Sequence, residues 1–414
     1  MDLQQLLHDL FNEVNLEKRR YIPDKLAKLG DWQSTKPLGE IITSQDQPLI
    51  MRNEAVESLG KQGDPAAIPY LINVLDDADE DIRRTAVWSL GQIGTAEAVD
   101  PVFSMTSDPS VEVRRWVAKS AGRIRADAVL DKLEHYLQSI DLTEDRVVAD
   151  ILRAVTSQIQ RLKNSQQSFW TRQCYEILNS TTALYVKQAA ILLLNQIYAQ
   201  GVTPESDQLR SVFETLPEND PLVRPHIFTG LAYAGDVEFL RLYLDQPIAI
   251  TSLGIAGADQ LLYEQLQTQN NELLSACLEG FSYLETYPDL SPYYDHENSN
   301  VRAQALQLHA LHHLPIQRLH TAFTAGDSKY KILELYRFYG SQAISVLKET
   351  ALHDEKVARQ YAVYSLISDE CISTADTSQV AAILQEVAHH DMIWHIRRDA
   401  RIGLERLGIS LISR

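Results

Sequence analysis

One phrase recurs at a fixed interval near the start of this chain, and that recurrence constrains the fold more than any other feature. The three copies read IMRNEAVESLGKQG (50–63), DIRRTAVWSLGQIG (81–94) and EVRRWVAKSAGRIR (112–125). Arg52, Arg83 and Arg114 stand 31 residues apart, and the glycines eight positions further on keep the same step. A fixed period of about 20–50 residues indicates an array of stacked structural repeats.

Each copy has the pattern of an amphipathic helix. Ile82, Ala86 and Leu90 are four residues apart and form one apolar stripe. Gly94 follows, where a left-handed helix end costs a glycine little. A second amphipathic run, AVDPVFSMTSD (98–108), comes next. Neither helix can bury its stripe alone, so the pattern predicts an all-α fold, an α-solenoid (superhelix) of stacked helical pairs.

The repeat also suggests how the chain is divided. We expect regular repeats with an N-terminal capping helix in residues 1–140, degenerate helical repeats in 141–290, and C-terminal repeats with a cap in 291–414, all in one continuous solenoid. The C-terminal segment is assigned on KVARQYAVYSL (356–366) and HIRRDARIGLERLG (395–408), which echo the first helix of the repeat.

The composition and the motifs argue against several classes of function. The net charge of −18 disfavours binding to nucleic acid or to an anionic membrane surface. No apolar run is long enough to span a bilayer, and the start lacks a secretory leader, so we expect a cytoplasmic protein. Phosphate-loop, dinucleotide-binding and nucleophile-elbow motifs are absent, and the three cysteines are isolated. We expect no metal site and no classical catalytic residue.

Two further patterns have structural interpretations. The recurring arginines predict a ladder of ion pairs to carboxylates at the end of the preceding helix. The expected partners are Asp77 and Asp81 for Arg83, and Asp108 and Glu112 for Arg114. The second arginines, at 84 and 115, are expected to be freer. The tyrosine- and proline-rich stretch 283–300 predicts a loop that its tyrosines hold against the body of the protein, and the alternative is a recognition loop folded over the groove.

The segment IRRTAVWSLGQIG, with Asp77 and Asp108, resembles the short HEAT-like repeat. The glycine-marked version is similar to repeats of cyanobacterial phycobilin lyases of the E/F type, which attach or rearrange open-chain tetrapyrroles on phycobiliprotein cysteines. The same repeat also occurs in adaptor-like proteins without lyase activity. The resemblance therefore implies the fold, and it leaves open whether the chain is an enzyme.

In such stacks the arginine-bearing helix lines the concave face, so its outward positions are the candidate binding residues. These positions mix indole rings with both signs of charge, which suits recognition of a partner or a flat ligand. Packing of Trp88 and Trp116 against neighbouring helices is the alternative. The candidates are Glu54, Glu57, Arg84, Trp88, Arg115, Trp116, Lys119 and Arg123, with Tyr361 and Tyr364 at the matching place in the C-terminal segment.

Two functions fit these observations. The first is a non-catalytic scaffold, adaptor or chaperone-like protein whose concave groove binds another protein and needs no cofactor. The alternative, which the resemblance implies, is a phycobilin lyase or bilin chaperone that holds phycocyanobilin or a related linear tetrapyrrole transiently. Arg84 and Arg115 would then hold the propionates. The partner would be a phycobiliprotein subunit or a second HEAT-repeat subunit.

Overall fold

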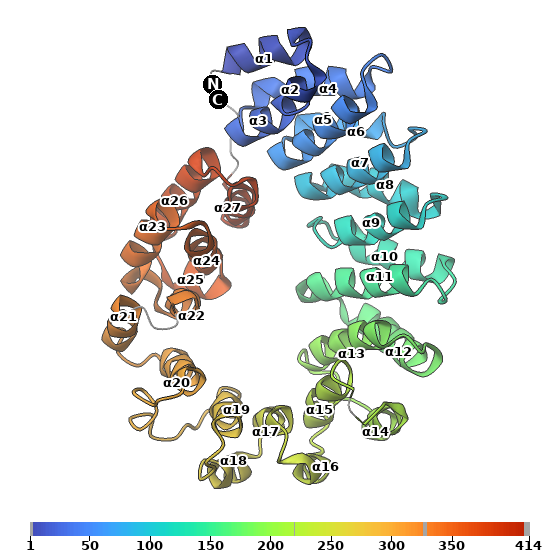
Figure 1. The fold of residues 1–414 in the computed structure, drawn as a ribbon. Coiled ribbons are helices and arrows are strands. Elements are labelled where there is room, and N and C mark those ends of the chain that lie inside the picture. Colours follow the sequence, from blue (N-terminus) through green and yellow to red (C-terminus); the bar gives the residue numbers. More distant parts are fainter. Residues whose placement is uncertain (1–2, 219, 326–328, 410–414) are drawn as a thin grey trace. The chain divides into compact units, whose positions relative to one another are not determined.

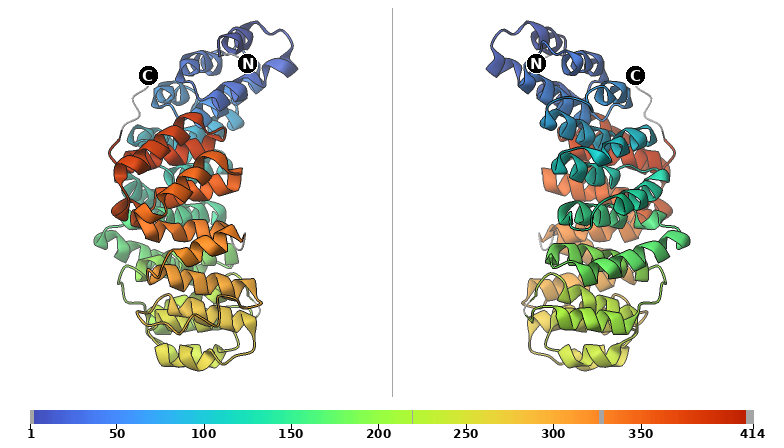
Figure 2. Two further views of the ribbon diagram at one scale, coloured as in Figure 1. Left: turned by 90° about the vertical axis from the view of Figure 1, so that its left-hand side faces the viewer. Right: turned by 90° about the vertical axis from the view of Figure 1, so that its right-hand side faces the viewer.

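The computed structural model describes residues 3–218, 220–325 and 329–409, and these residues form helices and connecting turns without any β-strand. The chain divides into two compact units, Met1–Val202 (unit 1) and Thr203–Arg414 (unit 2). Within each unit, successive helices stack side by side (Figures 1 and 2). The predicted all-α solenoid of helical pairs is confirmed, whereas the division at residues 140 and 290 stays a prediction.

Unit 1 is built from two layers of helices, the A layer and the B layer. Consecutive A-layer helices contact one another along the whole unit, and the B-layer helices cover one side of them. The A layer consists of α3 (Ile22–Leu29), α5 (Leu49–Gln62), α7 (Glu80–Ile93), α9 (Val111–Ala121), α11 (Asp145–Ser157) and α13 (Leu184–Tyr198). The B layer consists of α4 (Thr35–Thr43), α6 (Ile68–Ile72), α8 (Val99–Phe103), α10 (Ala128–Ser139) and α12 (Asn164–Ser180), and α1 (Leu3–Asn12) and α2 (Leu16–Arg19) precede both.

Unit 2 repeats this arrangement with more irregular spacing. Its A layer contains α15 (Arg224–Tyr233), α17 (Pro247–Ile255), α19 (Asn271–Phe281), α20 (Ser299–Leu311), α22 (Lys329–Leu335), α24 (Lys356–Leu366) and α27 (Trp394–Arg406). The remaining helices are α14 (Ser206–Thr215), α16 (Val237–Leu240), α18 (Asp259–Gln265), α21 (Gln317–Thr324), α23 (Ile344–His353), α25 (Asp369–Thr374) and α26 (Thr377–His390). None of the described helices is both long and apolar enough to cross a bilayer.

The apolar stripes read from the sequence form the core of unit 1. Ile82, Ala86 and Leu90 of α7 are fully buried, as the four-residue spacing predicts. Gly63 and Gly94 end α5 and α7 in the left-handed conformation, with φ of 70° and 73°. The first helices of these two pairs therefore end where the sequence indicates, and the second run of 98–108 forms α8 followed by a short 3₁₀ helix at Ser104–Ser107.

Glycine allows neighbouring A-layer helices to approach very closely. A Cβ atom on Gly91 of α7 would lie 2.5 Å from the Cβ and 2.7 Å from the Cα of Ser120 on α9. Gly60 of α5 meets Ser89 of α7 in the same way. The two serine hydroxyls donate hydrogen bonds across these contacts, over 2.8 Å from Ser89 to the carbonyl of Val56 and over 2.9 Å from Ser120 to that of Val87. The same glycine–serine contact thus joins two successive pairs of repeats.

The predicted arginine ladder exists, but its carboxylates lie later in the chain than the arginines, after the second helix of the same pair. Arg83 donates to the side chain of Asp108 over 2.8 and 3.1 Å, and Arg52 pairs with Asp77 in the same way. Toward the preceding helix end, Arg83 donates only to backbone carbonyls, those of Asp77 over 2.8 Å and of Ala78 over 3.3 Å. The expectation that Asp77 and Asp81 would neutralise Arg83 was wrong. Arg114 likewise pairs with Glu144 over 2.6 Å instead of Asp108 or Glu112.

Candidate functional site

Seven of the eight candidate residues of unit 1 lie on three consecutive A-layer helices, α5, α7 and α9, and Arg123 lies just beyond the end of α9. The repeat register places them in columns that run across these helices. One column holds Glu57, Trp88 and Lys119, and it continues to Arg153 of α11 when the helix starts are aligned. Its composition changes along the layer from acid to indole to two cations. Thr85 and Gln92, which the register also placed outward, are buried instead.

The α5 end of this face carries both signs of charge. Lys61 contacts Glu57 over 2.9 Å and Asp24 over 3.0 Å. Glu54 lies 3.8 Å from Arg20. Burial, followed by the neighbouring carboxylate of Glu57, raises the pKa of Glu54 above its usual value. The acids predicted here are therefore held in local pairs.

Helix α7 contributes the middle of the face. Arg84 pairs with Asp81, one turn earlier on the same helix, over 2.9 Å, and its side chain remains 37% exposed. Trp88 is half-buried, so the packing role and the surface role that the sequence left open both stay predictions. An indole in this position can bury further area when a partner covers it.

Helix α9 carries the densest group of interactions. Trp116 is flanked by the Lys119 ammonium, 4.7 Å from the ring centroid, and by the Arg123 guanidinium at 5.8 Å. Cations at these distances are attracted to the face of the indole ring. Arg115 points to the next helix and binds Asp150 of α11 over 2.9 Å. The expectation that Arg115 would be freer than the ladder arginines was wrong, because Asp150 and Glu112 both hold it.

Asp150 is the central residue that the sequence did not reveal. It is buried, with 4% of its surface exposed, and it accepts from Arg115 and from Arg153 over 3.2 Å. Lys119 lies 3.8 Å away. A buried carboxylate is stable only when cations and donors surround it, and Asp150 has three cations around it. The carboxylate therefore fixes side chains of α9 and α11 in one arrangement on the A-layer face.

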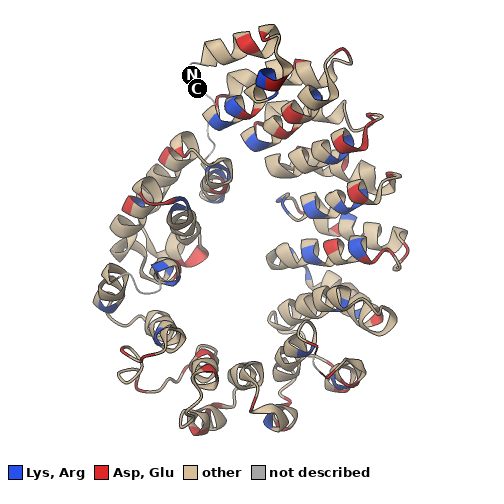
Figure 3. Cartoon of the chain, viewed as in Figure 1, with Lys and Arg blue, Asp and Glu red and all other residues tan. Residues whose placement is uncertain are grey.

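The electrostatic balance of this group is positive. Burial lowers the pKa of Lys119, the nearby Arg115 and Arg123 lower it further, and only the carboxylates of Asp150 and Glu112 oppose the shift. Lys and Arg residues outnumber acids along α9, whereas α5 and α11 carry both signs (Figure 3). On a chain of net charge −18, this patch differs from the rest of the surface.

The two candidate tyrosines lie in unit 2, on α24. Tyr361 stacks on Tyr330 of α22, with ring centroids 5.4 Å apart, and also contacts Tyr364. Tyr364 is 42% exposed, and its hydroxyl accepts from Gln360. The predicted aromatic surface is therefore present on the A layer of unit 2, as a cluster of its own.

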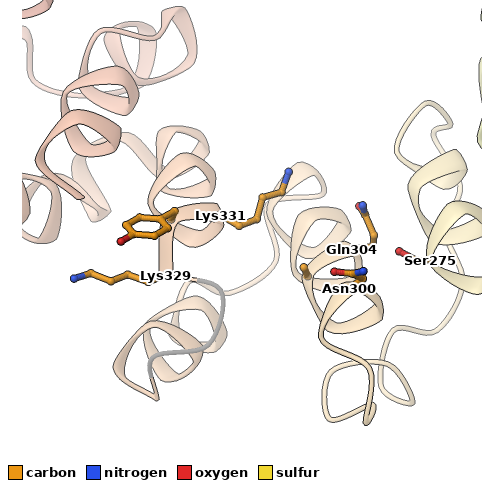
Figure 4. Close-up of a pocket in the computed structure, with 7 residues that line it drawn as sticks. Ser275, Asn300, Gln304, Lys329 and Lys331 are labelled. Carbon is orange, nitrogen blue, oxygen red and sulfur yellow. The ribbon is translucent and has the colours of Figure 1, made fainter. Parts of the chain in front are cut away.

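A polar pocket of about 730 Å³ lies next to that cluster and was not predicted (Figure 4). It is lined by Ser275, Asn300, Ala303, Gln304, Lys329, Tyr330 and Lys331, from α19, α20 and α22. Lys329 is already engaged by Asp354 over 2.9 Å, and Tyr330 donates to Glu355 over 2.7 Å. These acids offset the positive charge of the pocket, which leaves it without a strong preference for anions.

The loop of residues 283–300 is attached to unit 2 by its tyrosines, as predicted. The hydroxyl of Tyr294 lies 2.8 Å from Nδ1 of His309, and Tyr287 stacks on His312 with centroids 4.0 Å apart. Nε2 of His309 lies 2.9 Å from the carbonyl of Pro315. Since a carbonyl can only accept, Nε2 carries the proton and Nδ1 accepts from the tyrosine. His309 thus links two loops.

Comparisons with known proteins agree with the fold. Residues 3–85 and 68–154 match the model of the HEAT repeats family. No curated protein matches the sequence. Among solved structures, the chain resembles Kap95p in complex with RanGDP (14% identity, 98% of this chain and 62% of that one, TM-score 0.51). It also resembles importin beta (13%, 98% and 66%, 0.46) and the CpcE–CpcF complex of phycocyanin lyase from a Nostoc species (19%, 60% and 94%, 0.36). At these identities the similarity concerns the fold alone.

Proposed function

We infer that this chain, which is a HEAT-like repeat protein, is a non-catalytic scaffold or adaptor that binds another protein on the A-layer face of unit 1. The observation that best supports this inference is that two cations, Lys119 and Arg123, lie beside the ring of Trp116. The stacking of α9, the helix that bears Trp116, depends on other residues. The stack is held by the apolar stripes, by the glycine–serine contacts and by the arginine ladder. The side chains of the face are therefore available for recognition.

The chemistry of this face supports binding more than catalysis. Tryptophan and arginine are the residues in which the binding energy of protein interfaces is most often concentrated. Here both residue types stand on rigid helices, which reduces the entropy lost when a partner binds. Repeat stacks also provide extended surfaces that a partner can follow over several units.

Affinity purification with matched variants tests this proposal. We expect the wild-type protein to recover a stoichiometric partner from a native lysate, and Trp88→Ala/Trp116→Ala to lose that partner while keeping its helical circular dichroism. Trp32→Ala is the control, because Trp32 is a half-buried indole outside the A layer. Recovery of no stoichiometric partner, or equal recovery by the double variant, would contradict a scaffold that works through this face.

A bilin-handling function is the second candidate, and the same observation favours it. A half-buried indole flanked by two cations also suits a flat conjugated ligand with propionate groups. Arg123 and Lys119 are then better placed than Arg115, which Asp150 already holds. Phycocyanobilin mixed with the protein should give a sharpened, red-shifted absorption band. An unchanged spectrum at micromolar protein would remove this candidate, together with a phycobiliprotein subunit as the client.

A further inference from the structure

Several charged side chains of α9 and α11 form one connected network on the A-layer face of unit 1. Contacts run from Arg146 to Glu112 over 3.9 Å, from Glu112 to Arg115, and from Arg115 to Asp150. We call this group the Asp150 patch: Glu112, Arg115, Trp116, Lys119, Arg123, Arg146, Asp150 and Arg153.

The Asp150 patch carries more positive than negative charge. It contains five cationic side chains and two carboxylates, an excess of three positive charges. One of the two carboxylates, that of Asp150, is buried beneath the cations. It offsets part of their charge but is not itself exposed to solvent. The outermost groups are accessible: Arg146 is 68% exposed and Arg153 is 53% exposed. The patch therefore presents donors to solvent.

The surroundings of the patch limit what can bind there. The chain as a whole carries a charge of −18, which repels a long polyanion such as nucleic acid, and three positive charges displace few counterions from it. A short segment with a few carboxylates approaches at a much smaller cost. Guanidinium groups bind carboxylates through paired hydrogen bonds, and the indole of Trp116 offers an apolar contact beside them.

We propose that the Asp150 patch binds an acidic segment of the partner protein, with carboxylates on Arg123, Arg146 and Arg153 and an apolar side chain against Trp116. This inference rests on the proposed scaffold function and specifies the chemistry of its partner. Charge complementarity with the excess of positive charge on the patch favours such a segment.

Binding of a fluorescent oligo-glutamate peptide, followed by anisotropy at low salt, tests the proposal. The references are an oligo-glutamine peptide of equal length and a single-stranded oligodeoxynucleotide of equal charge. We expect the wild-type protein to bind the glutamate peptide at least about tenfold more tightly than either reference, and to lose this preference as salt screens the charges.

The variant Arg123→Glu/Arg146→Glu should lower the affinity of the protein for the glutamate peptide by about tenfold or more. It leaves the three cations around Asp150 in place, so the fold should be unaffected. Lys25→Glu/Lys28→Glu on α3 makes the same change in net charge within the same unit and is the matched control. The first variant should also gain affinity for an oligo-lysine peptide, which a merely unfolded protein would not do specifically.

Several results would overturn the inference. Equal binding of glutamate and glutamine peptides, equal losses in both charge-reversal variants, or tighter binding of the oligodeoxynucleotide would each exclude an acidic protein segment as the ligand. If binding of the purified native partner still requires Trp88 and Trp116 in that case, only the proposal that the bound segment is acidic is wrong. If the partner is also independent of both tryptophans, the scaffold proposal fails with it.

Discussion

Gly91 lies where two A-layer helices touch, and Gly91→Ala probes that contact. By helix propensity alone the change should stabilise α7, because alanine is about 1 kcal/mol more favourable than glycine in a helix interior. In the stack, however, the new methyl group would lie 2.5 Å from the Cβ and 2.7 Å from the Cα of Ser120. Ordinary carbon–carbon contacts are about 3.5–4.0 Å, so α7 and α9 must separate by about 1 Å.

That separation determines the expected magnitude. A gap of about 1 Å loses up to about half of the dispersion energy of the atoms that face it, and overpacked positions usually cost about 1–3 kcal/mol. The contact is with backbone, which cannot rotate away, so we place the cost near the upper limit. After the propensity gain, Gly91→Ala should destabilise the protein by about 2 kcal/mol, which corresponds to a melting temperature about 4–8 °C lower for a unit of this size.

Urea and thermal unfolding followed by circular dichroism at the helical band measure this effect. Gly122→Ala is the matched control, because a Cβ on Gly122 would meet Ser157 Oγ at 3.0 Å and Ala154 Cα at 3.3 Å, a smaller overlap. The control should be nearly neutral. If Gly91→Ala proves as stable as the wild type, or if both variants lose the same stability, close backbone approach is not what selects glycine at this position.

Three further outcomes follow from the described contacts. Burial opposes ionisation of Asp108, but the hydrogen bond from Arg83 holds its pKa below the ordinary value of 3.8. The ionised carboxylate therefore stabilises the folded state fully above pH 3.8, and this stabilisation is lost as the pH falls through the lower pKa of the folded state. Asp108→Asn should lose about 2–3 kcal/mol at neutral pH and show a flatter decline in urea midpoint between about pH 5 and pH 3; an identical decline would contradict the ladder. Tyr294→Phe removes the hydrogen bond to His309 and should cost about 1 kcal/mol, with faster amide exchange in the 283–300 loop as the readout and unchanged exchange as the contrary result. Burial raises the pKa of the Cys277 thiol to about 12, so this cysteine should react with a thiol reagent only after unfolding, and rapid modification of the folded protein would refute its burial.

The sequence predicts the local architecture because each local signal agrees with the fold. The apolar stripe of Ile82, Ala86 and Leu90 and the helix end at Gly94 depend only on helical periodicity and on backbone conformation. The direction of the arginine ladder could not be read in this way. Asp77 and Asp108 occupy the same place in successive repeats, so Arg83 has an aspartate on both sides, and its long side chain can reach either.

The centre of the candidate site was missed for a different reason. Between α9 and α11 the spacing of equivalent positions grows from 31 to 34 residues, because α10 has 12 residues where α6 and α8 have five. A 31-residue step from Lys119 therefore arrives at Asp150 instead of Arg153, and the change of spacing puts Asp150 in the buried contact with α9. The contact between Arg115 and Asp150, 35 residues apart, depends on how two helices pack, and no local pattern encodes it.

Because successive regular repeats are joined by the same glycine–serine contact, one repeat can take the place of another. The stretch that contains Ser89 and Gly91 carries both halves of the connection: its serine fits the repeat before it, and its glycine receives the serine of the repeat after it. A cassette of one full period, duplicated or removed in frame, would meet matching neighbours at both ends and change only the length of the array. An insertion of a single residue inside α7 would instead rotate the part of the helix beyond it by about 100°, so α7 could no longer align with both α5 and α9.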